Sequence, residues 1–469
     1  MSGTLLPGDT DRQHDLPAAA THRSAILAHD DPYVVLRSRD FRIFVCSSMV
    51  SVIGAQVQAC AIGWELWDRT GDTMMLGLVG LVKFLPVLIF TLPAGQIADW
   101  FDRKRILIAS HLVSVVAALS MAHLSFHKGP LSLFFGCILL RSVASTFGMT
   151  ARAALLPRIV PRAIFSKAVT WNSSVFELAL AIGPALGGFI LLWFSPFAAY
   201  LFDAACLLLA ALLTAILKPA PGEKSTEPAT LSSFMAGLHF VHGTKQILAA
   251  ITLDMFAVLF GGATALLPIY AKDILHVGPA GFGWLRAAPA IGAVCMAVIQ
   301  AHRRPLQKAG RSMLLAVAGF GIATIVFGLS TSFVLSLVML LLIGALDNIS
   351  VVVRHTMVQM LTPDSMRGRV SAVNGMFIGA SNQLGEFESG VAAKVCGGST
   401  HLKELLGASA GPVGSVVTGG IGTILAVTAV AVIWPQMRQI GALHDLKPQD
   451  QNRDREGAAA SAAQVTGDA

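Results

Sequence analysis

Two carboxylates lie within a long run of small, apolar and weakly polar residues near the C-terminus. Residues 382–390 read NQLGEFESG, which places Glu386 and Glu388 in a segment otherwise suited to a membrane-spanning helix. A charge at the bilayer centre costs about 2.5–3.5 kcal/mol on insertion scales, so such residues usually face a cavity or a partner. A carboxylate that alternates between a desolvated setting and a cation-paired one can bind and release a proton.

The spacing of the polar residues in this stretch distinguishes the two glutamates. Asn382, Glu386 and Ser389 share one helix face, whereas Glu388 points about 200° away from Glu386. This polar stripe favours a water-filled path, with Glu386 about 25 Å along the helix from Arg369. We interpret Glu386 as a carrier of protons or a ligand of the substrate, with a static ion pair between helices as the alternative. Glu388 is expected to pair with a base or to contact a neighbouring helix.

Basic residues also lie deep in apolar segments. Lys83 and Arg286 occur in equivalent sequences of the form Gly-x-x-basic-x-x-Pro. Two cations at equivalent positions could flank an anionic substrate or the glutamates. The alternative is that each cation has a partner with a structural role only. Arg141 lies near the middle of its segment.

The sequence gives weaker indications of a functional role for the remaining buried polar residues. Asp254 lies near the inner end of its segment and could act as a gate, and Asp347 with Arg354, on one helix face, favours a structural pair. Glu177 and Asp203 are interpreted as charges at helix ends. Gln56 could hydrogen-bond a substrate or serve helix packing.

The composition restricts the class of protein. Of 469 residues, 54% are hydrophobic and 13% charged, and the mean hydropathy is +0.67. Soluble domains carry about 25% charged residues, so a polytopic membrane protein is expected. The net charge of +7 comes from short loops rather than one patch, so we expect no nucleic-acid partner. There is no phosphate-binding loop for ATP, catalytic constellation, metal-ligand set or other cofactor motif. We therefore expect a transporter of a small-molecule substrate, driven by an ion gradient, and not an enzyme.

Twelve apolar stretches are long enough to cross a bilayer, for which about 20 residues are needed. Lysine and arginine concentrate in alternate loops, which puts both termini on the cytoplasmic side of the cell membrane. We thus predict an all-α membrane protein with twelve transmembrane helices in two six-helix bundles. The stretches are 42–67, 75–98, 105–126, 131–151, 171–194, 197–217, 247–270, 282–301, 311–330, 333–353, 371–396 and 413–434.

Five regions follow from this pattern. The loop between the bundles contains PAPGEKSTEP, and the LSSFMAGLHFVHG after it is expected to form an amphipathic surface helix. The expected regions are a cytoplasmic N-terminal tail (1–40), an N-terminal bundle (41–217), a cytoplasmic linker (218–245), a C-terminal bundle (246–434) and a cytoplasmic, disordered tail (435–469).

The two halves of the chain repeat. A shift of 202 positions superposes Arg152 on Arg354, Gly183 on Gly385 and Gly188 on Gly390, and a shift of 203 superposes GLVKFLP (80–86) on GWLRAAP (283–289). Partners six helices apart have the same orientation, so this is a parallel repeat about an axis along the membrane normal. That symmetry suits a transporter whose site lies between two bundles.

Two motifs resemble those of the major facilitator superfamily. The loop GQIADWFDRKRIL (95–107) matches the family's loop motif at Gly95, Asp99, Arg103 and Lys104, although Asp102 stands where a second glycine is usual. The resemblance implies a conformational switch at this loop, with Asp99 and Arg103 as its candidate pair. ALAIGPALGGFI (179–190) resembles the antiporter motif, with Gly183, Pro184, Gly187 and Gly188 as helix-packing residues. Arg141 resembles the family's intramembrane arginine, which implies a coupling role.

The chain resembles most the branch that contains the enterobactin exporter and many drug exporters. This likeness is carried by IGAQVQACAIGW (53–64), ARAALLP (151–157), LDMFAVLFGGATALLPIYA (253–271), MRGRVSAVN (366–374) and NQLGEFESG (382–390). It implies proton-coupled export of a small amphipathic molecule, a siderophore or drug, across the lipid bilayer. Solute uptake by the same fold and a non-transporting receptor or scaffold are the alternatives.

Overall fold

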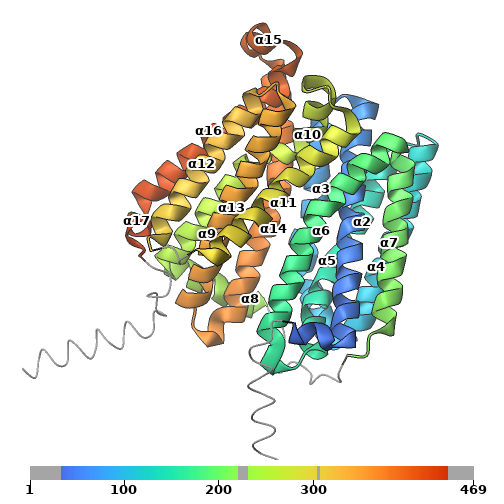
Figure 1. The fold of residues 1–469 in the computed structure, drawn as a ribbon, viewed down its shortest axis with the longest axis vertical. Coiled ribbons are helices and arrows are strands. Elements are labelled where there is room, and N and C mark those ends of the chain that lie inside the picture. The colour runs from blue at the N-terminus through green and yellow to red at the C-terminus, as the bar shows by residue number, and fades with distance from the viewer. Residues whose placement is uncertain (1–32, 220–230, 304–306, 442–469) are drawn as a thin grey trace, which may run out of the picture.

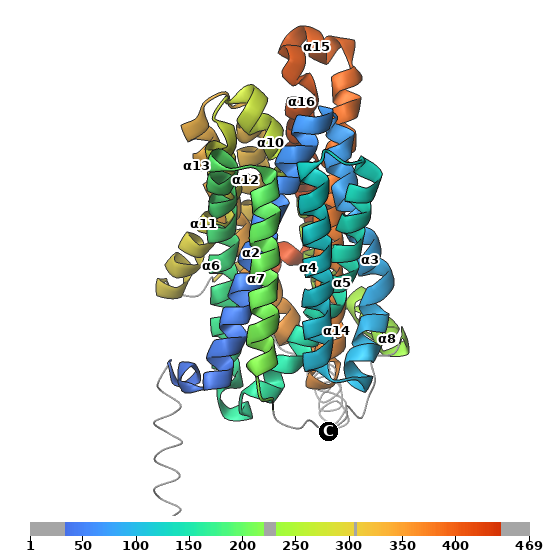
Figure 2. The same ribbon diagram turned by 90° about the vertical axis from the view of Figure 1, so that its right-hand side faces the viewer.

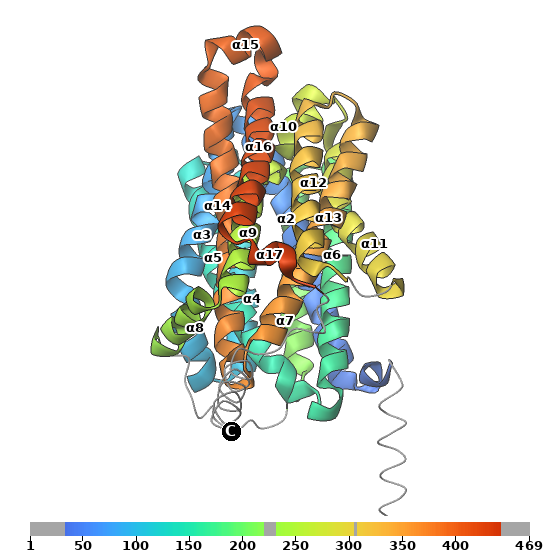
Figure 3. The same cartoon turned by 90° about the vertical axis from the view of Figure 1, so that its left-hand side faces the viewer.

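The computed structural model describes residues 33–219, 231–303 and 307–441. These ranges are almost entirely helical and contain no strand. Long helices run roughly parallel to one another and form a body with two distinct ends (Figures 1–3).

The N-terminal half consists of six long helices, drawn in blue to green in Figure 1. Side chains cap several of them: Ser38 accepts from Phe41 N, and Asp72 accepts from Met74 N at the next helix. Such caps satisfy backbone groups that lack a partner within the helix. The helices are α2 (Arg39–Thr70), α3 (Thr73–Trp100), α4 (Arg103–Phe126), α5 (Leu131–Ile159), α6 (Phe165–Trp193) and α7 (Pro196–Ile216), with short η1 (Val34–Arg37) and η2 (Arg162–Ile164).

The C-terminal half repeats this plan with additional short helices. Its long helices are α9 (Lys245–Phe260), α11 (Gly278–His302), α12 (Ala309–Leu329), α13 (Phe333–Leu361), α14 (Asp364–Gly398) and α16 (Ala410–Ile433). Its short elements are α8 (Leu231–Gly243), η3 (Ala263–Leu266), α10 (Leu267–Ile269), η4 (Tyr270–Ile274), α15 (Thr400–Leu406), η5 (Gly407–Ser409) and α17 (Gln436–Gln439).

The structure corrects one predicted helix. The stretch 247–270 does not form one continuous helix, because α9 ends at Phe260 and η3 begins at Ala263. Gly261 and Gly262 occupy the break, and glycine is unfavourable in a helix interior. A Cβ on Gly262 would collide with the carbonyl of Gly385 on α14, so the break also allows these backbones to approach closely.

Eleven stretches in the described part of the chain are long and apolar enough to cross a membrane. The predicted count of twelve is therefore not reached on this criterion, because α14 is not among them. This helix carries Glu386, Glu388 and Lys394, which reduce its apolar character. It nevertheless lies alongside α3, α9 and α16 in the body of the molecule.

Large apolar side chains are exposed around the body of the molecule. Val116 is 58% exposed, Leu133 58%, Leu315 73% and Leu425 63%. Soluble monomers rarely expose broad contiguous apolar surfaces, whereas lipid tails cover such a surface in a membrane. The protein is therefore a multi-pass membrane protein.

The helices form two bundles that meet along two seams. Helix α3 packs against α14, and α6 packs against α11. The backbones touch at Gly77 with Gly390 and at Gly188 with Gly283, where an added Cβ would approach the opposite Cα to 2.5–2.9 Å. Shifts of 202 and 203 positions relate α6 to α14 and α3 to α11, so one seam is the pseudo-two-fold mate of the other.

The two ends of the molecule differ in how closely the bundles approach. We call them the α15 end and the α8 end after the short helix that each carries. Both glycine contacts lie in the half toward the α15 end, and the ribbons of the two bundles spread apart toward the α8 end (Figure 1). The amphipathic helix expected from LSSFMAGLHFVHG is confirmed as α8, which packs on α14 and α9.

Candidate functional site

The first candidate site is an ion pair across the α3–α14 seam. Lys83 Nζ lies 3.5 Å from Glu386 Oε2, and the two side chains remain 26% and 22% exposed. Gly80, one turn before Lys83, lets the helices approach, because a Cβ there would lie 2.7 Å from the Glu386 Cβ. Both charges are thus paired in this conformation, and neither side chain is fully buried.

The rest of the polar stripe differs from the prediction. Ser389 is buried, and its carbonyl accepts a hydrogen bond from Ser415 inside the C-terminal bundle. Ser389 therefore does not line a path, so the expectation of a wet face along all three residues is wrong. Asn382 is exposed, and its amide donates to the carbonyl of Ile378 in its own helix. Glu388 is partly buried and has no ion pair within the described ranges.

Arg141 on α5 forms a bidentate ion pair inside the N-terminal bundle. Its Nη1 lies 2.6 Å from Asp203 Oδ2, and its Nη2 lies 3.1 Å from Oδ1. Asp203 on α7 is 0% exposed, so its interpretation as a charge at a helix end is wrong. A buried pair with this geometry satisfies both partners.

The C-terminal bundle holds a second buried ion pair. Arg354 on α13 lies 3.2 Å from Asp254 on α9 and donates to Asn374 on α14 at 3.1 Å. All three are buried, with Arg354 only 1% exposed. The predicted pair of Asp347 with Arg354 is wrong, because Arg354 reaches a different helix. A gating role for Asp254 stays a prediction.

Arg286 and Gln56 lie near the α6–α11 seam and its neighbour α2. Arg286 is partly exposed, and in the part of the chain that the structure describes no carboxylate pairs with it. Gln56 packs beneath α6, where a Cβ on Gly183 would lie 2.5 Å from the Gln56 Cβ. Gly187 packs similarly on Cys60, and Gly188 faces Gly283 across the seam, with the Pro184 carbonyl beside it.

Among the described residues, the polar contacts of the loop motif at the α8 end lie within its own bundle. Arg103 lies 3.3 Å from Asp99 and donates to the carbonyls of Ala98 and Ala154. Lys104 donates to the carbonyl of Leu217 at 2.7 Å. Asp102 caps α4 in an extended conformation, so no glycine is required at this departure from the motif. Gly95 lies on α3, one turn before Asp99.

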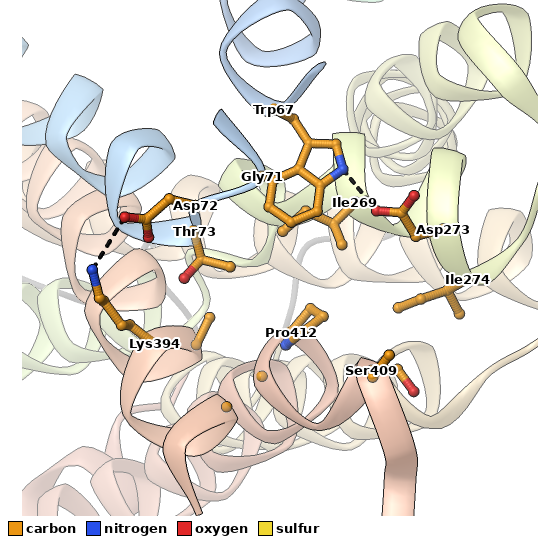
Figure 4. Close-up of a pocket in the computed structure, with 14 residues that line it drawn as sticks. Trp67, Gly71, Asp72, Thr73, Ile269, Asp273, Ile274, Lys394, Ser409 and Pro412 are labelled. Carbon is orange, nitrogen blue, oxygen red and sulfur yellow. Dashed lines mark hydrogen bonds and ion pairs between the residues drawn. The ribbon is translucent and has the colours of Figure 1, made fainter. Parts of the chain in front are cut away.

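The sequence reasoning missed a group of contacts at the α15 end. There a cavity of about 550 Å³ lies between the bundles, lined by residues such as Trp67, Thr73, Ser409 and Pro412 (Figure 4). Three polar contacts cross from one bundle to the other around it. Trp67 donates to Asp273 at 2.7 Å, Lys394 lies 3.1 Å from Asp72, and Lys272 pairs with Asp68.

The electrostatics of Asp72 favour its charged form. The Met74 backbone N–H and the Lys394 ammonium hold the pKa of Asp72 below its ordinary value of 3.8. The signal in the sequence was charges of both signs just after the first and seventh stretches, together with Lys394 near the end of the eleventh. It did not indicate which of these charges would meet.

Comparisons with known proteins agree with this architecture. A family model described as transmembrane secretion effector matches residues 31–425. The chain is 25% identical to the multidrug efflux pump Tap of Mycolicibacterium fortuitum, over 76% of this chain and 89% of that protein. It is 24% identical to the enterobactin exporter EntS of Escherichia coli, over 85% of this chain and 92% of that protein.

Solved structures share the fold at lower identity. A bacterial homologue of the human lysosomal transporter Spinster, in an inward-facing and occupied conformation, has a TM-score of 0.68 at 12% identity and covers 87% of this chain and 99% of its own. The nucleoside transporter NupG has a TM-score of 0.62 at 13% identity, covering 84% of this chain and 99% of its own.

Proposed function

This chain belongs to the transmembrane secretion effector family of major facilitator transporters, and from that premise we propose that it exports a small amphipathic molecule in exchange for protons, with Glu386 as the proton carrier. The observation that carries the proposal is the ion pair of Glu386 with Lys83, which joins the two bundles where they must separate for the α15 end to open. Efflux by the relatives Tap and EntS supports the direction.

The proposed orientation puts the α8 end in the cytoplasm. This follows the basic loops, such as the one holding Arg103 and Lys104, and leaves both termini on the cytoplasmic side of the cell membrane. The bundles touch toward the α15 end, and in the proposed orientation this supports a state that is closed to the outside. In this orientation the substrate enters from the α8 end.

The proton cycle uses the seam itself. When the α15 end is open, Glu386 takes up a proton from outside, and the neutral acid is easier to bury as the seam closes. Closure brings the Lys83 ammonium next to the acid, and this favours the carboxylate, so the proton leaves toward the cytoplasmic side. Substrate bound between the bundles then separates α3 from α14 again.

Transport by inverted membrane vesicles tests this proposal. Two fluorescent dyes serve as substrates, the anion anilinonaphthalene sulfonate and its neutral relative phenylnaphthylamine. Wild type should accumulate at least one dye when a proton gradient is imposed and stop when a protonophore collapses it. Glu386→Gln should abolish the gradient-driven flux, because an amide cannot take up and release a proton. Glu404→Gln, which changes an exposed carboxylate on α15, is the matched control and should transport normally.

Each alternative predicts a different result. A non-transporting receptor or scaffold shows no gradient-driven flux of either dye in wild type. Solute uptake moves solute in the opposite direction across the same vesicles. Undiminished flux in Glu386→Gln would show that this residue does not carry the proton.

A further inference from the structure

The repeat places two arginines at equivalent positions, and each reaches the first helix of its bundle. Arg152 on α5 donates from Nη2 to Ser51 Oγ on α2 at 2.9 Å. Arg354 on α13 lies 3.2 Å from Asp254 on α9. A shift of 202 relates the arginines, and a shift of 203 relates Ser51 to Asp254. The same contact is therefore built twice, with a hydroxyl in one copy and a carboxylate in the other.

This difference leaves the two arginines in opposite electrostatic states. Arg354 is neutralised by Asp254 and also bonded to Asn374. Within the described ranges Arg152 has Ser51 as its hydrogen-bond acceptor and no carboxylate within ion-pair distance. A guanidinium in a low-dielectric surrounding without a counter-charge is costly, so its position favours the approach of an anion.

The neighbouring groups do not supply that anion. Arg152 and Arg141 both act electrostatically on His111 of α4, which is 5% exposed and whose Nε2 has no hydrogen-bond partner in the part of the chain that the structure describes. Asp203, the acid of the buried ion pair in this bundle, is already bound by both terminal nitrogens of Arg141. The region around Arg152 thus has positive charge and an unbonded polar nitrogen.

Arg152 lies on the part of α5 that runs to the α8 end. It lies seven residues before the end of α5 at Ile159, about 10 Å from the α8 end. It is partly exposed, and Ser145 and Met149, on adjacent turns of the same side of α5, are exposed. Arg286 also has no carboxylate partner among the described residues, but it lies beside Gly283, where the bundles are closed.

We propose that Arg152, with Ser51, forms a subsite that binds an anionic group of the transported molecule, such as a carboxylate, sulfonate or phosphate. The planar guanidinium can donate two parallel hydrogen bonds to any of these groups. The subsite rests on the proposed export function and narrows its substrates to amphipathic anions that enter from the α8 end. The C-terminal copy cannot do the same, because Asp254 occupies the equivalent place.

Dye binding to the full chain in nanodiscs of phosphatidylcholine tests the subsite. Ser51→Asp puts into the first repeat the carboxylate that the second already has. It should weaken binding of anilinonaphthalene sulfonate roughly tenfold or more while phenylnaphthylamine binding stays within about twofold. Ser51→Asn has nearly the same size as Ser51→Asp but no charge, so its effect measures the loss of the hydroxyl alone and should be smaller for the anionic dye than the effect of Ser51→Asp. Arg152→Gln should reproduce the selective loss, and size-exclusion profiles check that each variant folds.

Three results would overturn the subsite. They are unchanged binding of the anionic dye to Ser51→Asp, equal loss of both dyes, and equal effects of Ser51→Asp and Ser51→Asn. Adding phosphatidylglycerol to the nanodiscs tests whether a lipid headgroup occupies the subsite. If this lipid displaces the anionic dye from wild type but not from Ser51→Asp, the subsite binds lipid and the substrate assignment fails. Binding is measured without a gradient and is therefore independent of transport. If the wild type binds the anionic dye selectively but shows no gradient-driven flux, the export function is wrong while the anion-binding subsite stands.

Discussion

At the scale of single residues, the deep charges divide into those neutralised within one bundle and those that meet across the seam. Arg141 with Asp203 and Arg354 with Asp254 each tie helices of the same bundle together. Lys83 and Glu386 belong to different bundles. The first two pairs can persist while the bundles move, whereas the third must break when the α15 end opens, which is why we assign the coupling role to it.

The buried pair of the C-terminal bundle gives a prediction for stability. Asp254→Asn leaves Arg354 buried without a counter-charge and should lower the free energy of unfolding by about 3–5 kcal/mol. Thermal unfolding of the purified protein in detergent measures this loss. Arg105→Gln removes an exposed ion pair with Asp102 and should change stability by no more than about 0.5 kcal/mol.

The double variant Asp254→Asn with Arg354→Met separates the loss of charge balance from the loss of packing. It should recover part of the stability, because no buried charge remains unpaired. Equal stability of Asp254→Asn and Arg105→Gln would contradict the account of this pair.

At the scale of elements, the contacts at the α15 end hold α2 and α3 of one bundle to η4 and α14 of the other. Lys394→Gln together with Lys272→Gln removes two cations that cross between the bundles. We expect this double variant to shift the population toward an open α15 end. Spin labels on the exposed positions Lys128 and Thr331, in a background without the six cysteines, measure the change as a longer distance distribution. An unchanged distribution would show that these pairs do not hold the end closed.

Asp72 makes the contribution of one of these contacts dependent on pH. Its pKa is depressed below 3.8 in the closed state, so the stabilisation is present above that value and is lost as the pH falls through the depressed pKa. We expect the Lys128–Thr331 distance of wild type to stay constant between about pH 5 and pH 8 and to lengthen only below about pH 4. Asp72→Asn keeps a residue that can cap α3 but removes the charge, so it should lengthen the distance at neutral pH. If the Lys128–Thr331 distance of wild type lengthens near pH 6, the pH effect comes from a group other than Asp72.

At the scale of the whole molecule, close backbone contact along two seams defines the observed state. A leucine at Gly283 would push into Gly188 and the Pro184 carbonyl, where even a Cβ would lie within 2.7–2.8 Å. Gly283→Leu should therefore separate α6 from α11 and favour the state that is open at the α15 end. The same spin-label pair reports this shift.

Gly398→Leu is the matched control for this steric prediction. A Cβ on Gly398 meets nothing within 4 Å, so the substitution should leave the distance distribution unchanged. Normal closure in Gly283→Leu would mean that the seam tolerates a side chain and that these glycine contacts do not set the closed state.

The sequence by itself determined the class of protein, the long helices and the parallel repeat. Each depends on information that is local or repeated along the chain, namely the length of an apolar stretch and matched residues such as Gly188 with Gly390. The break after Phe260 was missed, because hydropathy does not register a backbone break inside an apolar run.

Only the tertiary structure decided which charges meet. Arg354 has Asp347 two turns away on its own helix, yet it pairs with Asp254 on α9, and Lys394 reaches Asp72 from the other half of the chain. Pairing depends on which helix faces come together after packing and on rotamers that place charged atoms within about 4 Å. The sequence could therefore name a pair close along the chain, Asp99 with Arg103, but it could not determine which charges on different helices would meet.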